Sequence, residues 1–271
     1  MPLSAADIAA RHRLAEELAR EGGALAMSYF ERLASLAVEF KKGGQDVVSI
    51  ADRSVEALIR ARVAVAFPQD GVLGEEEGLT EGTSGALWIV DPIDGTSPFL
   101  AGMADWCVSI AVVEEARPVV GVIYKPTSEE MFSSADGLGA TLNGAPMRVE
   151  PKRGLGEGLL GYGCNHRIPA ADVARFVEVL LASGGMFYRN ASGALMLAYV
   201  AAGRLVGYFE HHMNSWDCAA GLCLIREAGG WQNDFLAGDG ILNGNRIAAG
   251  APQIRGELAA LVEAAGVERF F

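Results

Sequence analysis

Trp88-Ile89-Val90-Asp91-Pro92-Ile93-Asp94-Gly95-Thr96 is an apolar run that ends in two aspartates and a turn. The apolar residues predict a buried strand, and Pro92 fixes its own φ and favours a turn after Asp91. Two carboxylates on either side of such a turn can converge on one point. Gly95 lets the backbone approach a ligand closely, and the N–H groups of Gly95 and Thr96 can form an anion-binding nest. The stretch therefore predicts a cation site beside a phosphate site, against the simpler interpretation of an Asp-Pro turn closed by Asp-Gly.

Two further apolar runs follow this stretch, Cys107 to Val113 and Val119 to Tyr124, and proline, glycine and acidic residues separate them. Runs of this length predict the strands of a sheet. The connections between them are too short for crossover helices, so we expect several of these strands to pair antiparallel.

Helical patterns precede these strands. Ser4 to Asp7 resembles a capping box, and a helical apolar spacing follows at Leu14, Leu18, Leu25 and Tyr29. A second apolar helical face, ended by Pro68, comprises Val55, Leu58, Ile59, Val63 and Ala66. The polar segment 41–46 between the two helices is typical of a surface loop.

Strand and helix patterns alternate again in the second half of the chain. In order, they predict a strand over 158–163, a helix through 173–180, a helix near 195–202, a strand over 205–209 and a helix over 217–228. Helices layered on mixed sheets are the expected result. We interpret residues 1–271 as one domain with two lobes, about 1–155 and about 156–271.

The composition fits a chain that folds throughout, with 51% hydrophobic and 21% charged residues. Charged residues throughout positions 1–20 exclude a secretory signal, and no run of about 18 apolar residues occurs, so we expect a cytoplasmic protein. A net charge of −12 argues against nucleic acids and anionic membranes as partners. An anionic substrate would need an imported positive charge, for which a divalent cation is the natural candidate.

The cysteines form neither a C-x-x-C pair nor a zinc-like group with the four histidines. They are Cys107, Cys164, Cys218 and Cys223. Buried free thiols are the prediction.

Two more acidic clusters accompany the Asp91–Asp94 pair. Glu75 lies in Gly74-Glu75-Glu76-Glu77-Gly78, directly after the apolar Val72-Leu73, and so at the end of a predicted strand. Asp217 opens a predicted helix, for which it could serve as the N-cap. A solvated acidic loop and a helix cap are the simpler interpretations of these two clusters. Oxygen ligands drawn from separate clusters, however, suit Mg²⁺.

Together, the three acidic segments resemble the signature motifs of the inositol monophosphatase family, in order and at the expected separations. The segments are Gly74-Glu75-Glu76, residues 88–96, and Trp216-Asp217-Cys218-Ala219-Ala220-Gly221. The resemblance covers nearly the whole chain. It implies an αβαβα sandwich of the inositol monophosphatase and fructose bisphosphatase type, a phosphatase that depends on two or three Mg²⁺ ions, sensitivity to lithium, and a homodimer.

The resemblance also implies roles for individual residues. Glu75, Asp91, Asp94, Asp217 and the carbonyl of Ile93 would hold the metals. Glu75, Asp94 and Thr96 would be the catalytic residues, with Glu75 and Thr96 orienting the attacking water, and Gly95 and Thr96 would bind the phosphate. Arg189, Ser192 and Glu210 would contact the substrate, and Lys41 and Asp46 would lie on a mobile loop that closes over the metals.

Departures from the family pattern concentrate where the substrate would bind. Ser97-Pro98-Phe99 replaces Thr-Asn-Phe, Ala104-Asp105 replaces a Pro-His-like pair, and Met196 replaces an aspartate. An inositol 1-phosphate-like monoester is therefore one candidate substrate among several. Histidinol phosphate, a nucleotide 3′-phosphate and a sugar phosphate stay open, as do the roles of His211, His212 and Asn214.

Other functional classes have less support in the sequence. A Gly-x-Ser-x-Gly elbow, a Walker lysine loop and a Gly-x-Gly-x-x-Gly motif after a strand are all missing. Some members of the family also act as partners of the transcription machinery. The intact Glu75 and Asp91 favour an enzyme over a non-catalytic partner of that kind.

Overall fold

The computed structural model describes residues 2–33, 38–40, 47–268 and 270–271. Lys41 and Asp46, the residues predicted for a mobile loop, lie outside this range. The α-helices are α1 (Ala5–Phe30), α2 (Ile50–Ala66), α3 (Thr96–Leu100), α4 (Ala170–Ala182), α5 (Gly193–Ala201), α6 (Ser215–Glu227), α7 (Gly240–Asn243) and α8 (Arg255–Ala264). Two short 3₁₀ helices lie at Pro126–Ser128 and Pro252–Ile254.

An eight-stranded sheet is built from the first half of the chain. Its strands, in spatial order, are β10 (Ala145–Pro146), β9 (Gly139–Leu142), β8 (Glu130–Ala135), β7 (Arg117–Lys125), β6 (Cys107–Glu114), β5 (Ala86–Asp94), β3 (Gly71–Gly74) and β4 (Gly78–Thr80). Strands β5 to β8 pair antiparallel, and the short connections predicted this for β5, β6 and β7. The β3–β5 pair is parallel, so both of these strands end at the same edge of the sheet.

A five-stranded sheet follows in the second half. Its order is β12 (Met186–Tyr188), β11 (Leu159–Gly163), β13 (Gly207–Met213), β15 (Asn245–Gly250) and β14 (Trp231–Gln232). The strands β12, β11 and β13 are parallel, and β15 is antiparallel to both of its neighbours. A separate antiparallel pair joins β1 (Val38–Phe40) to β2 (Val47–Ser49).

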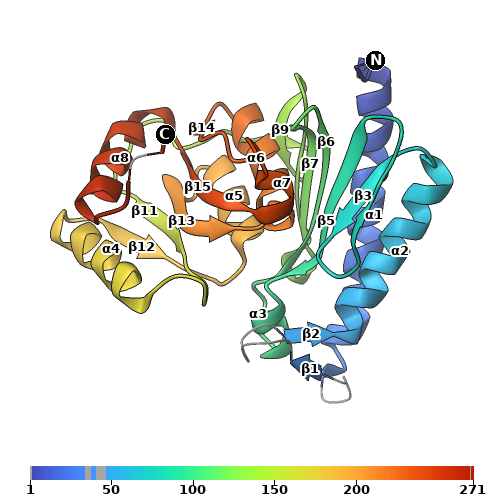
Figure 1. The fold of residues 1–271 in the computed structure, drawn as a ribbon, viewed down its shortest axis with the longest axis horizontal. Coiled ribbons are helices and arrows are strands. Elements are labelled where there is room, and N and C mark those ends of the chain that lie inside the picture. The colour runs from blue at the N-terminus through green and yellow to red at the C-terminus, as the bar shows by residue number, and fades with distance from the viewer. Residues whose placement is uncertain (1, 34–37, 41–46, 269) are drawn as a thin grey trace.

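The elements stack in five layers, which confirms the predicted αβαβα sandwich (Figure 1). Helices α1 and α2 cover one face of the eight-stranded sheet, and α5 and α6 cover its other face. The five-stranded sheet packs on the far side of α5 and α6, and α4 and α8 lie together on its outer face. The middle helical layer therefore touches both sheets, and residues at its ends can reach the edges of both.

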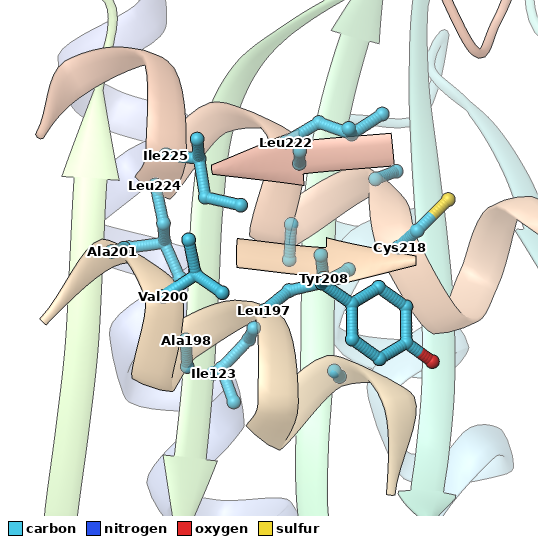
Figure 2. Close-up of a cluster of buried hydrophobic side chains, with 14 of the residues drawn as sticks. Ile123, Leu197, Ala198, Val200, Ala201, Tyr208, Cys218, Leu222, Leu224 and Ile225 are labelled. Atoms are coloured by element: carbon cyan, nitrogen blue, oxygen red, sulfur yellow. The ribbon is translucent and has the colours of Figure 1, made fainter. Parts of the chain in front are cut away.

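Three apolar cores lie between the layers: one under α1 and α2, one under α4 and α8, and one around the middle helices. The middle core joins the two sheets through α5 and α6, and Figure 2 shows Leu197, Leu224 and Ile225 from these helices gathered with Ile123 of β7 and Tyr208 of β13. Because α5 and α6 are apolar nearly all round, they suit an interior layer.

The first two helices follow the predicted patterns in most respects. Ser4 and Asp7 form the predicted capping box, in which Asp7 N donates to Ser4 Oγ at 3.2 Å and Ser4 N donates to Asp7 Oδ2 at 3.0 Å. In α2, the prediction that Ala66 joins the apolar face is wrong, because this last helical residue is exposed, and Leu58 is only half-buried. The carboxylates of Asp52 and Glu56 are buried on that face instead.

The four cysteines are free thiols, as predicted, and Cys107, Cys218 and Cys223 are buried, whereas Cys164 is half-buried. Among the helices that the structure describes, none has the length and apolar character needed to span a membrane.

Candidate metal and phosphate site

Three carboxylates from separate elements converge at one edge of the eight-stranded sheet. Glu75 follows β3, Asp91 lies near the end of β5, and Asp217 lies in the first turn of α6. One oxygen from each of these residues lies within 4.8 Å of the others. Such a set of hard oxygen donors fits Mg²⁺, so the residue types expected of a metal site meet in space.

The parallel pairing of β3 with β5 brings the first two carboxylates together. Gly74 is in register with Val90, and the amide of Glu75 donates to the carbonyl of Val90 at 3.2 Å. Glu75 and Asp91 are the next residues along their two chains. Their proximity therefore follows from strand register rather than from side-chain flexibility.

Asp91 is held by the turn that contains Pro92. Its Oδ1 accepts a 3.0 Å hydrogen bond from the amide of Ile93, and the pairing of β5 with β6 is irregular between Asp91 and Asp94. The Asp91 side chain is buried. Burial, followed by the negative charges of Glu75, Asp94 and Asp217, raises the pKa of Asp91 well above its usual range.

Asp94 lies outside the 4.8 Å group, because one of its oxygens is turned toward the start of α5. Its Oδ2 accepts hydrogen bonds from Ser192 Oγ at 2.6 Å and from the amide of Ala194 at 2.7 Å. Burial raises the pKa of Asp94 to about 6, although these hydrogen bonds oppose the shift. Asp94 is 7% exposed and is one of the residues that line the cavity described below.

Asp217 is not the N-cap of α6, which corrects the sequence-based alternative. Asn214 occupies the N-cap position, and Asp217 is the third helical residue of a capping box. The Asn214 amide donates to Asp217 Oδ2 at 3.2 Å. Burial and then the charge of Asp94 raise the pKa of Asp217 to about 7. The residue thus caps the helix and also reaches the carboxylate cluster.

The raised pKa values have a common physical cause. Several carboxylates lie close together and are partly or fully removed from solvent, so like charges and desolvation both disfavour the ionised forms. A bound divalent cation reverses this situation, because it favours every nearby carboxylate in its charged form. The raised pKa values and the oxygen donors of these residues are therefore both consistent with a divalent cation site.

A cavity of about 300 Å³ opens beside the cluster. Its acidic lining residues are Glu75, Asp94, Asp217 and Glu210, its basic ones are Arg167 and Arg189, and its thioethers are Met196 and Met213. Elements of both sheets and of the middle helices supply this lining. A small substrate can therefore contact the carboxylate cluster and the second sheet at the same time.

Glu210 of β13 lines this cavity, where family resemblance implies substrate contact. Its carboxylate accepts hydrogen bonds from the Tyr208 hydroxyl and from Asn165 Nδ2, the latter at 3.1 Å. Burial raises the pKa of Glu210 to about 7. The neutral and charged forms are thus both accessible near neutral pH.

Arg189 and Ser192 have different surroundings. Arg189 is exposed at the cavity and donates to the carbonyl of Cys164 at 3.2 Å. Ser192 is fully buried, at 0% exposure, and its hydroxyl contacts Asp94. Ser192 is not among the cavity-lining residues that the structure describes, and its contact with the substrate stays a prediction.

Gly95 and Thr96 continue from Asp94 into the short helix α3. Gly95 has a φ of 95°, and a Cβ there would lie 2.7 Å from the carbonyl oxygen of Asp105, so both conformation and space require glycine. Thr96 Oγ1 donates to the carbonyl of Ile93 at 3.1 Å. Neither Gly95 nor Thr96 is among the described residues that line the cavity. Their contact with the phosphate stays a prediction.

The remaining substrate-end residues divide between the cavity and other surroundings. Met196 and Asn214 line the cavity, whereas Pro98 is buried within α3. Asp105 pairs with Lys125 at 3.2 Å. His211 is buried against Phe209, with ring centroids 4.9 Å apart, and His212 contacts Arg167 and the carbonyl of Asn243.

Three further cavity residues, Asn165, Arg167 and Tyr208, were not predicted from the sequence. Arg167 donates to Asn214 Oδ1 at 3.1 Å, so the 163–167 loop contacts the start of α6. The alternation of β13 indicates Tyr208 and Glu210 on one face, which could have identified Tyr208. The loop residues carry no comparable pattern.

Comparisons with known proteins find relatives over most of the chain. The model of the inositol monophosphatase family matches residues 8–266. The chain is 42% identical to an inositol-1-monophosphatase of Mesorhizobium japonicum over 77% of this chain and 80% of that protein. It is 39% identical to the Nus factor SuhB of Xylella fastidiosa over 82% of this chain and 80% of that protein. The crystal structure of the extragenic suppressor protein suhB of Bartonella henselae superposes with a TM-score of 0.85 at 34% identity, covering 93% and 97% of the two chains.

Proposed function

The chain belongs to the inositol monophosphatase family, and on this basis we propose that it is a Mg²⁺-dependent phosphatase that hydrolyses the phosphate monoester of a small polar metabolite. One observation carries the proposal. Oxygens of Glu75, Asp91 and Asp217 lie within 4.8 Å of one another. The cavity of about 300 Å³ beside them has room for a small monoester.

Two or three Mg²⁺ ions would be held by Glu75, Asp91, Asp94, Asp217 and the carbonyl of Ile93. The raised pKa values of the buried aspartates support this assignment, because such a cluster gains most from a cation. When bound, the ions neutralise charge on the phosphoryl oxygens and lower the pKa of water. The carboxylates would therefore serve chiefly to hold charge in a fixed geometry.

Other residues of the chain would orient the reactants. Glu75 and Thr96 position the attacking water, with Glu75 accepting its proton, and the amides of Gly95 and Thr96 hold the phosphate. The 2.6 Å hydrogen bond from Ser192 supports a role for that residue in fixing Asp94. General-base help is worth about 10²–10⁴-fold, so fixed charges must supply most of the remaining acceleration. The segment of about 1–155 would carry the phosphate and all the metal ligands except Asp217, which about 156–271 would add together with the contacts to the rest of the substrate.

The substrate would be a hydroxyl-bearing monoester of the inositol 1-phosphate class. Glu210 and Asn165 offer an acceptor and a donor for hydroxyls, and Arg167 and Arg189 offer further donors. Met196 and Met213 add an apolar wall, on which an unpaired hydroxyl would be disfavoured. Histidinol phosphate and nucleotide 3′-phosphates are the alternatives within the same chemistry.

A panel of phosphate monoesters assayed for released phosphate tests this function. The panel includes myo-inositol 1-phosphate, a sugar phosphate, histidinol phosphate, a nucleotide 3′-phosphate and an aryl phosphate. We expect Mg²⁺-dependent release from at least one polyol or sugar phosphate, ranked by kcat/KM. No release from any member with Mg²⁺ present would contradict the proposal.

A second candidate function follows from the relatives named Nus factor SuhB. In this role the chain would be a non-catalytic partner of the transcription machinery. The test is direct binding of the purified chain to bacterial RNA polymerase, with Asp94→Asn as a comparison. Binding that survives this substitution, together with no phosphatase activity in the wild type, would favour the second function.

A homodimer is also part of the proposal. The edge strand β12 exposes Met186 and Phe187, which are 58% and 38% exposed, and a dimer would cover such residues. Light scattering should give a dimer that Met186→Lys weakens, whereas Leu138→Lys, at an exposed residue of the turn between β8 and β9, leaves it intact. A monomeric wild-type protein would contradict the assignment.

A further inference from the structure

Glu56 of α2 is a carboxylate buried in the fold, with 0% of its surface exposed. It belongs to the helical face that otherwise buries Val55, Ile59 and Val63. A buried carboxylate without partners is strongly unfavourable, so the groups around Glu56 must satisfy both of its oxygens.

The partners of Glu56 are the backbone of the acidic loop that carries Glu75. Its Oε2 accepts a 2.8 Å hydrogen bond from the amide of Glu76, and its Oε1 accepts a 3.0 Å hydrogen bond from the amide of Glu77. Arg60, one helical turn further along, donates Nε to the same Oε1 at 2.7 Å. One carboxylate thus binds the two residues that directly follow Glu75.

Arg60 extends this anchor across the loop. Its guanidinium donates to the carbonyl of Gly78 and to Thr80 Oγ1, the latter at 3.2 Å. The side chain of Arg60 is only 12% exposed. The Glu56–Arg60 pair therefore contacts the β3–β4 connection on both sides of its turn.

Gly74 makes room for the buried carboxylate. A Cβ at this position would lie 2.2 Å from Glu56 Oε1, far inside van der Waals contact. The Gly74 φ is not in the left-handed region, so the need for glycine here is spatial. The residue before Glu75 is thus shaped to admit Glu56.

Glu75 is consequently fixed from both directions along the chain. Its own amide donates to the carbonyl of Val90, the residue before Asp91, at 3.2 Å. The next two amides donate to Glu56. We propose that Glu56 is a positioning residue for the cation site, which fixes the backbone of Glu75 so that its carboxylate faces Asp91 and Asp217. This inference rests on the proposed function of that site.

The chain contains a matched contact away from the site. Glu227 Oε2 accepts hydrogen bonds from the amides of Gly137 and Gly139, both at 3.1 Å, and Arg226 donates to its other oxygen at 3.3 Å. Here too one carboxylate fixes two loop amides beside an arginine. Glu227 lies at the opposite end of α6 from Asp217, about 15 Å along the helix.

Two measurements separate a positioning role of Glu56 from a purely structural one. They are Mg²⁺ titration by isothermal calorimetry and urea unfolding of the metal-free proteins. We expect Glu56→Gln to weaken Mg²⁺ binding by about 10–100-fold, as substitutions behind metal ligands do. Glu227→Gln should keep the wild-type Kd, even where both variants lose stability. A Glu56→Gln Kd within about threefold of the wild type, or an equal loss in Glu227→Gln, would overturn the inference.

Gly74→Ala provides a second test in which residue 56 remains a glutamate. The added methyl group displaces the carboxylate from the loop amides, so it should weaken Mg²⁺ binding in the same direction. Wild-type affinity in Gly74→Ala would overturn the inference even where Glu56→Gln does not fold. A wild-type protein that binds no Mg²⁺ would overturn the proposed function itself, which distinguishes the two failures.

Discussion

The carboxylate of Asp94, at the end of β5, accepts a 2.6 Å hydrogen bond from the hydroxyl of Ser192, the N-cap of α5. The two residues are 98 positions apart in the chain. The contact joins the edge of the eight-stranded sheet to the middle helical layer. Because Asp94 also lines the cavity, one side chain links the fold to the proposed chemistry.

Asp94→Asn should abolish most turnover with little loss of fold. The amide oxygen of asparagine can still accept from Ser192 and Ala194, whereas the charge is lost. We expect kcat to fall by at least about 10²–10³-fold, the range for losing one fixed electrostatic group. Steady-state kinetics and thermal unfolding measure the two effects. Asp136→Asn, at a surface pair with Arg117, serves as the control, and a near-normal kcat in Asp94→Asn would refute the metal-site assignment.

The metal-free protein should lose stability as the pH rises from about 5 to 8. Burial raises the pKa of Asp94 to about 6 and of Asp217 and Glu210 to about 7. The folded state therefore binds more protons than the unfolded state between the ordinary carboxyl pKa values and these raised ones, and stability falls with pH over that window.

The measurement is the Tm in chelator at several pH values, repeated with excess Mg²⁺. Because Mg²⁺ favours the charged carboxylates, it should reduce the loss of Tm toward pH 8. A metal-free Tm that rises steadily across the same range would show that these carboxylates are not crowded.

The helix α2 offers a test of core packing that is independent of the site. Ile59 is fully buried, so Ile59→Ala should cost about 2–5 kcal/mol of unfolding free energy. Leu58 is half-buried, so Leu58→Ala should cost less unfolding free energy than Ile59→Ala. Its place on the predicted apolar helical face had indicated full burial and a similar cost. Urea unfolding compares the two variants. Equal costs would mean that the burial of this face differs from that described.

Glu210→Gln should change substrate ranking more than chemistry at phosphorus. The carboxylate lines the cavity and is satisfied by Tyr208 and Asn165, so its replacement alters how substrate hydroxyls pair. Losing one such pairing costs about 1–3 kcal/mol, or roughly ten- to a hundredfold in kcat/KM. The comparison is polyol, amino-alcohol and nucleotide phosphates against an aryl phosphate. An equal fall on every substrate would argue for a role in the chemical step.

The wild-type enzyme should not prefer myo-inositol 1-phosphate by a thousandfold over all other monoesters. Met196 lines the cavity where the family pattern has an aspartate, whereas Pro98 is buried and has less bearing on substrate choice. The expectation therefore depends on Met196 more than on Pro98.

The strands around Asp91 could be predicted from the sequence because the two faces of the central strands are buried and their apolar runs are continuous. The acidic segments predicted Glu75, Asp91 and Asp217 as metal ligands, and oxygens of these three residues lie close together in the structure. The αβαβα layering depended on family resemblance, since apolar runs do not specify which layers stack.

The positions that could not be predicted depend on tertiary contacts. Asn214 and Asp217 both suit a helix cap, and only the backbone shows that Asn214 is the N-cap. The burial of Glu56 could be suspected from its helical spacing with Asp52 and Ile59. Its partner amide at Glu76 lies 20 residues away, however, and no local pattern indicates it. The burial of Ser192 likewise comes from α5 packing against the end of β5.

The rate of phosphate release as a function of free Mg²⁺, from excess chelator to millimolar metal, tests the central claim most directly. We predict no turnover in chelator, recovery as Mg²⁺ is added, and activity that survives thiol alkylation under native conditions. Burial raises the pKa of the Cys107 and Cys218 thiols, so neither is an available nucleophile. Full activity in excess chelator would contradict the account.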